Sequence, residues 1–177
     1  MVKLHLGCGN KKIKDYINID IRKEVNPDLI EDISKLETFC ENSVDIIYVS
    51  HVLEHFSRHE YKKVLSRWYD ILKKDGILRI SVPDFESINE YYNNTKDLSK
   101  LIGLLYGGQN YKENYHYYVW DFKTLEKDLK SVNFKKVIKF NWRETEHFQV
   151  DDFSQSYLPH MDKINGKLMS LNVEAIK

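Results

Sequence analysis

Short apolar segments bounded by turn residues alternate along this chain with longer segments whose apolar residues recur every three or four positions. In the first half, the short segments that predict buried strands are residues 3–6, 16–20, 29–31, 44–50 and 77–82. Residues 60–72 have the helical spacing and end before Asp75-Gly76, which predicts a helix that stops there. Strands that alternate with helices indicate an α/β fold whose mostly parallel sheet is covered on both faces by helices.

The pattern becomes less regular in the second half of the chain. Further helices are predicted over residues 85–92, 98–106 and 121–132, and further strands over residues 134–140 and 168–176. We expect the last two strands to pair as an antiparallel hairpin. An aromatic stretch at 111–120 and a polar connection at 141–166 fit neither period.

A glycine turn joins the first two predicted strands and has the features of a nucleoside-cofactor site. Gly7 and Gly9 let backbone N–H groups approach a ligand, and Asp20 at the end of the next strand can accept hydrogen bonds from a ribose diol. The dinucleotide fingerprint is incomplete, because its third glycine is missing and only seven residues separate Gly9 from Ile17. A full phosphate-binding helix does not fit in that space, so a pyrophosphate would be poorly held.

These motifs give the chain a resemblance to a known enzyme family. It is similar to class I S-adenosylmethionine-dependent methyltransferases in residues 4–10 (LHLGCGN), Asp20, Asp32-Ile33, and the segments 44–56 and 72–84. Gly107-Gly108-Gln109, Phe134 and residues 170–175 resemble a small bacterial branch associated with surface-polysaccharide and sugar modification. The resemblance implies a Rossmann-like fold with a shortened first helix. It also implies a single methyltransferase domain over residues 1–177, in which residues 84–120 form a substrate-facing insertion or lid.

The resemblance also implies which residues hold S-adenosylmethionine. The implied cofactor residues are Gly7, Cys8, Gly9, Asp20, Ile21, Asp32, Ile33, Ser50 and His51. The glycine loop would face the methionine part, Asp20 the ribose, and Asp32 with Ile33 the adenine. Each has a structural alternative: an ordinary tight turn, a solvated acid at a strand end, and a cap of a helix beginning at Ser34.

Methyl transfer to a hydroxyl group needs a group that takes the acceptor's proton, and histidine suits this task at neutral pH. His116 is the first candidate, and His51, at the end of a central strand, is the second. Gln109, Tyr115 and Tyr117 would bind the acceptor, although an aromatic core histidine with packing tyrosines has the same pattern. In the late polar connection, residues that could reach an acceptor, or be only solvated, are Arg143, Asp151, Asp152 and His160.

The pentapeptide His51-Val52-Leu53-Glu54-His55 also matches the H-x-x-E-H pattern of inverted zinc peptidases. That pattern needs a long helix and a third, distant carboxylate ligand. Here it directly follows a predicted strand, so we expect no metal and assign Glu54 and His55 to the helix start and to packing.

The balance of charged residues argues against some classes of binding partner. Lys plus Arg and Asp plus Glu both number 27, so no net charge attracts nucleic acid or an anionic bilayer. The sequence has no apolar run of signal-peptide or membrane-spanning length, which predicts a cytoplasmic protein. Its two cysteines, Cys8 and Cys40, form no disulfide framework.

The function predicted from these features is S-adenosylmethionine-dependent methylation of an oxygen, or less favourably a nitrogen, on a small sugar-type acceptor. The acceptor would be a sugar nucleotide or a surface-polysaccharide unit, and the product of the cofactor S-adenosylhomocysteine. The enzyme would be a monomer or a homodimer that binds neither nucleic acid nor membrane. The alternatives are a non-catalytic, partner-dependent subunit of a methyltransferase complex and a zinc hydrolase that uses His51 and His55.

Overall fold

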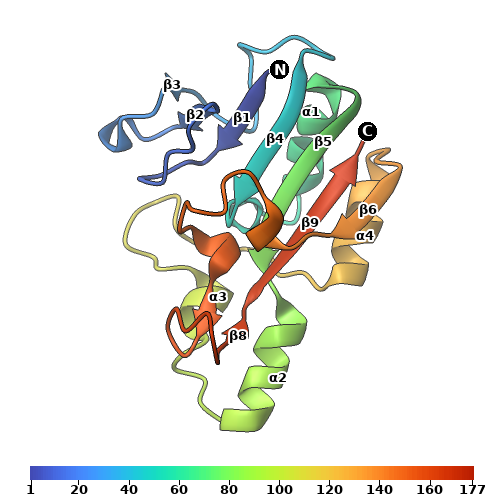
Figure 1. The fold of residues 1–177 in the computed structure, drawn as a ribbon. Coiled ribbons are helices and arrows are strands. Elements are labelled where there is room, and N and C mark those ends of the chain that lie inside the picture. The colour runs from blue at the N-terminus through green and yellow to red at the C-terminus, as the bar shows by residue number, and fades with distance from the viewer.

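A seven-stranded sheet forms the centre of the computed structural model, which describes residues 1–177 (Figure 1). Its strand order is β3-β2-β1-β4-β5-β9-β6, with β9 antiparallel to both of its neighbours and the other neighbouring strands parallel. The strands are β1 (Lys3–Leu6), β2 (Ile17–Asp20), β3 (Leu29–Ile30), β4 (Val44–Ser50), β5 (Leu72–Pro83), β6 (Lys136–Lys139) and β9 (Ser170–Ile176). A separate ladder pairs β7 (Tyr157–Leu158) with β8 (Lys167–Leu168). The predicted α/β fold, with its mostly parallel sheet and C-terminal antiparallel pair, is confirmed.

Four α-helices accompany the sheet, and none lies between β1 and β2, as the short connection predicts. They are α1 (Tyr61–Ile71), α2 (Phe85–Thr95), α3 (Ile102–Tyr106) and α4 (Phe122–Ser131). The helix predicted over 98–106 begins later, because the Asp97 carboxylate accepts hydrogen bonds from the Ser99 N–H and hydroxyl and closes a turn there. None of the helices has the length and apolar character that crossing a bilayer requires.

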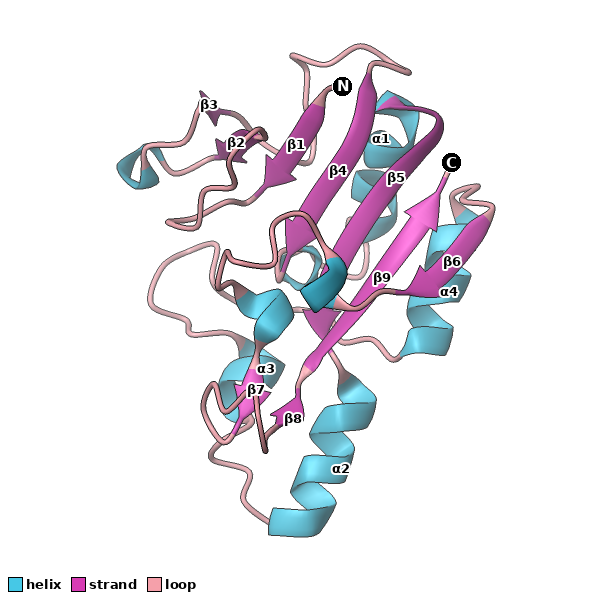
Figure 2. Cartoon of the chain, viewed as in Figure 1, coloured by secondary structure: helices cyan, strands magenta, loops and turns pink.

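Helices α1 and α4 lie on one face of the sheet, where the main core forms (Figure 2). On β5, Leu78, Ile80 and Val82 alternate with polar residues and are fully buried among the side chains of this core. Trp68 of α1 and Leu129 of α4 are also fully buried there. The apolar half of each element therefore fixes which face of the sheet packs against these helices. The parallel direction of β1, β4 and β5 places the loops that follow them at the same edge of the sheet.

The opposite face carries no long helix, so the prediction of helices on both faces is wrong. Residues 141–157, with the short turns η3 (Trp142–Glu144) and η4 (Phe153–Gln155), cross this face instead (Figure 2). Neighbouring strands place His5, Tyr48, Arg79 and Glu174 in one cross-strand row. A row of polar side chains cannot be covered by an apolar helix stripe, and the polar late segment covers it.

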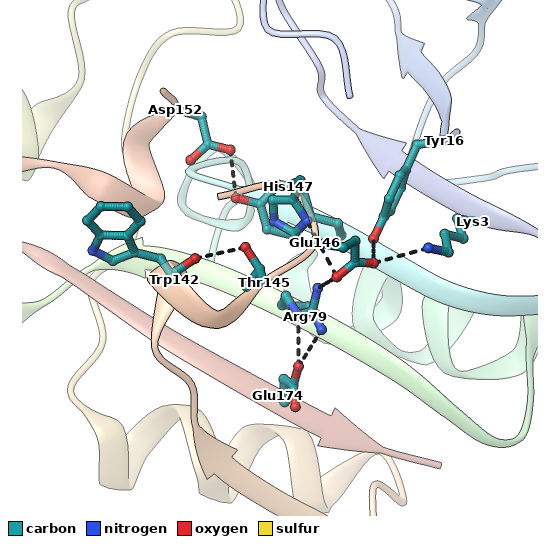
Figure 3. Close-up of polar contacts among 10 residues, drawn as sticks. Lys3, Tyr16, Arg79, Trp142, Thr145, Glu146, His147, Asp152 and Glu174 are labelled. Atoms are coloured by element: carbon teal, nitrogen blue, oxygen red, sulfur yellow. Dashed lines mark hydrogen bonds and ion pairs between the residues drawn. The ribbon is translucent and has the colours of Figure 1, made fainter. Parts of the chain in front are cut away.

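Glu146 joins this late segment to the sheet (Figure 3). Its carboxylate accepts hydrogen bonds from the Tyr16 hydroxyl at 2.6 Å and from Arg79 Nη1 at 2.9 Å, and it lies 3.2 Å from Lys3 Nζ. Arg79 Nη2 also lies 2.7 Å from the Glu174 carboxylate. This network fixes residues 141–157 over the sheet and brings Phe153 against the ring of His51, at 5.4 Å between ring centroids.

Candidate functional site

The glycine loop after β1 packs directly against the turn after β4. Gly7 and Gly9 have φ values of +64° and +50°, which favour glycine. A Cβ atom on Gly7 would lie 2.5 Å from Cγ2 of Val52, the residue that follows His51. The space behind Gly7 is therefore closed by Val52, whereas a Cβ on Gly9 would meet only the Arg22 guanidinium, at 3.5 Å.

Asp20 ends β2 beside this loop and is buried. Its Oδ2 accepts a hydrogen bond from the Gly9 N–H at 2.8 Å, and its Oδ1 accepts from the Arg22 N–H at 2.9 Å. Arg22 Nε also donates to Oδ1, at 3.2 Å. The carboxylate thus faces the loop, with the Arg22 side chain donating to it, while the Ile21 side chain is exposed. The assignment of Asp20 to a cofactor ribose stays a prediction.

Asp32 and Ile33 lie in the turn that follows β3. Asp32 Oδ1 accepts from the Ser34 N–H at 3.0 Å and from its hydroxyl at 2.6 Å, and the Ile33 carbonyl accepts from Trp68 Nε1 at 2.8 Å. The segment is a turn and not the start of a helix. Asp32 Oδ2 has Lys35 Nζ as its ion-pair partner, at 3.7 Å. The assignment of Asp32 to the adenine stays a prediction.

The residues of this edge fit a nucleoside cofactor. The two positive-φ glycines carry no side chain of their own that would cover the loop, Asp20 supplies a carboxylate, and the buried Ser50 hydroxyl has no hydrogen-bond partner. An unpartnered buried hydroxyl is costly unless a ligand or water satisfies it. Cys8 is buried too, and burial raises the pKa of its thiol to about 11, so it is no nucleophile at neutral pH.

His51 lies in a strained turn at the end of β4. Its φ is +52°, its N–H donates to the Ser81 carbonyl at 2.9 Å, and its Nε2 lies 3.0 Å from Ser170 Oγ. Its other ring nitrogen, Nδ1, lies 3.4 Å from Glu54 Oε1. Burial lowers the pKa of His51 to about 3, so the ring is neutral in the folded protein.

Glu54 is the residue that sequence reasoning missed. Its side chain is fully buried, neither carboxylate oxygen has a hydrogen-bond partner, and burial raises its pKa to about 8. His116 Nε2 lies 4.0 Å from Glu54 Oε1, and the Glu54 carbonyl accepts from the Tyr117 N–H at 2.7 Å. The H-x-x-E-H pattern contained this residue. The turn η2 (Leu53–His55) is only three residues long, however, so the long helix of a zinc peptidase is not formed.

The predicted lid segment, residues 84–120, places His116 beside Glu54 and next to His55 of η2. His116 Nδ1 donates to the Leu104 carbonyl at 2.9 Å, and burial lowers the pKa of this ring to about 4. The His55 ring lies 4.8 Å from the His116 ring and between two carbonyl oxygens, of Tyr115 and His51, each at 3.1 Å. The structure therefore brings both predicted histidines, His51 and His116, to one buried carboxylate.

The predicted acceptor residues are distributed over the surface of the same segment. His116, Tyr106 and Tyr117 help to line a pocket of about 450 Å³, and the Tyr117 ring is exposed. Tyr115 is exposed, and Gln109 donates from its side chain to the Tyr106 carbonyl at 3.2 Å. In the late connection, Arg143 contacts Tyr157 and Lys163, Asp151 pairs with Lys163, Asp152 accepts from Tyr48, and His160 is exposed.

A family model described as a methyltransferase domain matches residues 4–80, which include the glycine loop, Asp20 and Glu54. No curated protein sequence matches the chain. Solved structures are similar in fold over 99% of this chain, and three of them are informative. A SAM-dependent methyltransferase from Archaeoglobus fulgidus has a TM-score of 0.60, 18% sequence identity and 85% of its own chain covered.

The other two structures were solved with a bound ligand or a partner protein. The 1,6-didemethyltoxoflavin-N1-methyltransferase of Burkholderia thailandensis, solved with S-adenosylhomocysteine, has a TM-score of 0.59, 16% identity and 70% of its chain covered. A putative methyltransferase of Haloferax volcanii, solved in complex with the Trm112 methyltransferase activator, has a TM-score of 0.60, 13% identity and 81% covered. The chain therefore has the Rossmann-like fold of SAM-dependent methyltransferases.

Proposed function

We propose that this protein is an S-adenosylmethionine-dependent methyltransferase that methylates an oxygen of a small sugar-type acceptor. The observation that carries the proposal is the contact between Gly7 and Val52, which puts the glycine loop next to the His51 turn. A cofactor over the loop would then have its reactive end near His51 and His116. Such an edge, at the carboxyl ends of parallel strands, is where open α/β sheets form their sites.

The cofactor would be held mainly by backbone groups and one acid. Gly7, Cys8 and Gly9 would face its methionine part, and Asp20 would accept from the ribose hydroxyls after the Arg22 side chain moves aside. No helix follows the loop, so loop amides replace the helix dipole as the source of positive potential. When bound, S-adenosylmethionine supplies a methyl group that is already activated on its sulfonium.

The chain's own residues would orient the acceptor and remove its proton. Neutral His116 donates from Nδ1 to Leu104, which leaves the Nε2 lone pair free to take a hydroxyl proton. The exposed ring of Tyr117, on the same pocket, offers an apolar face on which a sugar ring can stack. Resemblance to the surface-polysaccharide branch supports a sugar nucleotide or a polysaccharide unit as acceptor.

A partner-dependent subunit is the second candidate. The β3 edge strand leaves Ile30 exposed, and Ile21 is exposed on the segment that leads to it, so an apolar surface is available beside the cofactor loop. The Haloferax volcanii neighbour was solved with an activator protein. Under this alternative the chain would bind cofactor but turn over only after a partner is added.

Two measurements test the proposal. Calorimetry with S-adenosylmethionine and S-adenosylhomocysteine should give one binding site per chain, and absence of binding by folded protein would overturn the proposal. Methyl-labelled cofactor should then transfer label to a member of a panel of sugar nucleotides and polysaccharide fragments. Transfer only to amines would overturn the acceptor assignment, and binding without any transfer would favour the partner-dependent subunit.

A further inference from the structure

Glu54, His55 and His116 place one potential ligand atom each within 4.8 Å of one another, beneath the lid segment. We propose that these three side chains, with His51 at the edge of the cluster, bind a divalent transition-metal ion. The site goes beyond the proposed function, which assigns no metal, and it departs from the expectation of no metal that the sequence analysis drew for residues 51–55. Metal binding can be measured without turnover. Its role in methyl transfer rests on the proposed function, with one change: when an ion is bound, His116 Nε2 is a ligand of the ion and no longer the base.

The first argument is the isolation of the Glu54 carboxylate. The side chain is fully buried, and both oxygens lack a hydrogen-bond partner within the protein. A buried charge without a partner is strongly unfavourable, so this carboxyl group needs either a proton or a cation. The groups around it are the imidazoles of His51 and His116, at 3.4 Å and 4.0 Å from Oε1.

The second argument is the way the imidazoles are held. His116 donates from Nδ1 to the Leu104 carbonyl, which fixes its tautomer and leaves an Nε2 lone pair on the side of Glu54. His51 contacts Ser170 through Nε2 and turns Nδ1 toward the same carboxylate. Metal-bound histidines typically have this arrangement, with one nitrogen on a protein group and the other on the ion.

His55 supplies the third argument. Its two ring nitrogens each lie 3.1 Å from a carbonyl oxygen, of Tyr115 and of His51. A neutral imidazole carries a single N–H and can donate to only one of the two carbonyl oxygens. The lone pair of the other ring nitrogen then faces a carbonyl oxygen, which is repulsive. Coordination of a cation by this nitrogen would remove that repulsion.

The donor set indicates the kind of ion. Imidazole nitrogens with one carboxylate oxygen suit zinc and neighbouring transition metals, whereas Ca²⁺ and Mg²⁺ prefer oxygen-only sets. His116 also lines the pocket with Tyr117, so a free coordination position on that side could take an acceptor oxygen. A hydroxyl bound to such an ion has a lowered pKa, which would help methylation.

Metal-free protein prepared with a chelator allows a direct test. Titration with Co²⁺, followed by visible absorption, and with Zn²⁺, followed by calorimetry, should show one ion bound per chain. Glu54→Gln and His116→Ala should each raise the Kd for Zn²⁺ by at least about 100-fold. His59→Ala is the matched control, since His59 is exposed and close in sequence, and it should bind like the wild type.

The outcomes separate cleanly. If the folded wild type binds neither ion at one equivalent, the proposal is overturned, and Glu54 is then neutralised by a proton shared with the histidines. This result needs only the wild type, so it holds even if a variant fails to fold. Unchanged affinity in both Glu54→Gln and His116→Ala also overturns it. Titration of the same samples with S-adenosylhomocysteine reports the proposed function separately, because cofactor affinity depends on the glycine loop and Asp20.

Discussion

The guanidinium group of Arg22 stacks over the ring of Tyr111, with its Cζ atom 4.5 Å from the ring centroid. The same side chain donates to the Asp20 carboxylate from Nε. Tyr111 belongs to the predicted lid segment, whose residues Tyr115 and Tyr117 contact His55 and Glu54. Arg22 therefore links this segment to the acid that we assign to the cofactor ribose.

Replacing Arg22 should strengthen cofactor binding. A ribose diol must displace the guanidinium from Asp20, and a partly exposed cation–π contact is worth about 0.5–1 kcal/mol. We expect Arg22→Ala to lower the Kd for S-adenosylhomocysteine by about two- to fivefold, measured by calorimetry. Arg58→Ala, at an exposed position, should leave the Kd unchanged. Weaker binding in Arg22→Ala would mean that Arg22 itself contacts the cofactor.

Removing the acid should have the opposite effect. Asp20→Ala leaves the ribose hydroxyls without an acceptor and also frees the Gly9 N–H that Asp20 now satisfies. The expected loss in binding free energy for S-adenosylhomocysteine is about 1–3 kcal/mol. Glu24→Ala changes an exposed acid of the next turn and serves as control. Equal affinity in the two variants would remove Asp20 from the cofactor site.

The sequence was sufficient where local pattern decides the structure. The apolar periodicities located β1 and β4 to the residue, placed α1 and α4 within one residue at each end, and indicated the missing helix before β2. The sequence did not predict where residues 141–157 lie, because their position depends on hydrogen bonds of Glu146 with Tyr16 and Arg79, which are distant in sequence. A polar alternation on a strand does not say whether water or a polar segment covers that face.

The same limit applies to the candidate site. Glycines at a strand end and an acid one strand later are local features, so the sequence alone locates the loop and Asp20, whose assignment to the cofactor stays a prediction. Glu54 can be recognised as a candidate site residue only in the folded chain, where His116, 62 residues later in the sequence, lies against it. Nothing in the local sequence distinguishes a buried, unpartnered carboxylate from one at the start of a helix.

His116→Ala should separate turnover from cofactor binding. The variant lacks Nε2, which either takes the acceptor proton or binds a cation, while the glycine loop and Asp20 are unchanged. We expect methyl transfer to fall by at least about 10²-fold. The Kd for S-adenosylhomocysteine should stay within about twofold of the wild type, a difference of about 0.4 kcal/mol. His160→Ala, an exposed histidine, is the control. Full turnover in folded His116→Ala would exclude this residue from the reaction.

Glu146 should matter for stability and not for chemistry. Burial raises its pKa, but hydrogen bonds from Tyr16 and Arg79 outweigh this and hold the pKa well below its usual value. Glu146→Ala leaves the buried Arg79 with one partner fewer, and because Glu146 is partly exposed we expect a loss of only about 1–3 kcal/mol in urea unfolding. Glu144→Ala, in the exposed turn before it, should cost less. Equal stability of the two variants would contradict the role of Glu146 as the anchor of residues 141–157.

His147 should make the fold sensitive to mild acid. Its ring is buried against Tyr48, at 4.1 Å between centroids, and its Nδ1 has no hydrogen-bond partner. Burial, with the nearby charge of Arg79, lowers its pKa from the ordinary 6.5 to about 4. Between these values the unfolded chain binds a proton that the folded chain does not, so the free energy of unfolding falls as pH drops from 6.5 toward 4 and is constant above. His147→Phe removes this contribution. Measured by urea unfolding at several pH values, the stability of the variant relative to the wild type should therefore rise as the pH is lowered from 6.5 toward 4. Parallel pH profiles for the two proteins would show that His147 is protonated in the folded state.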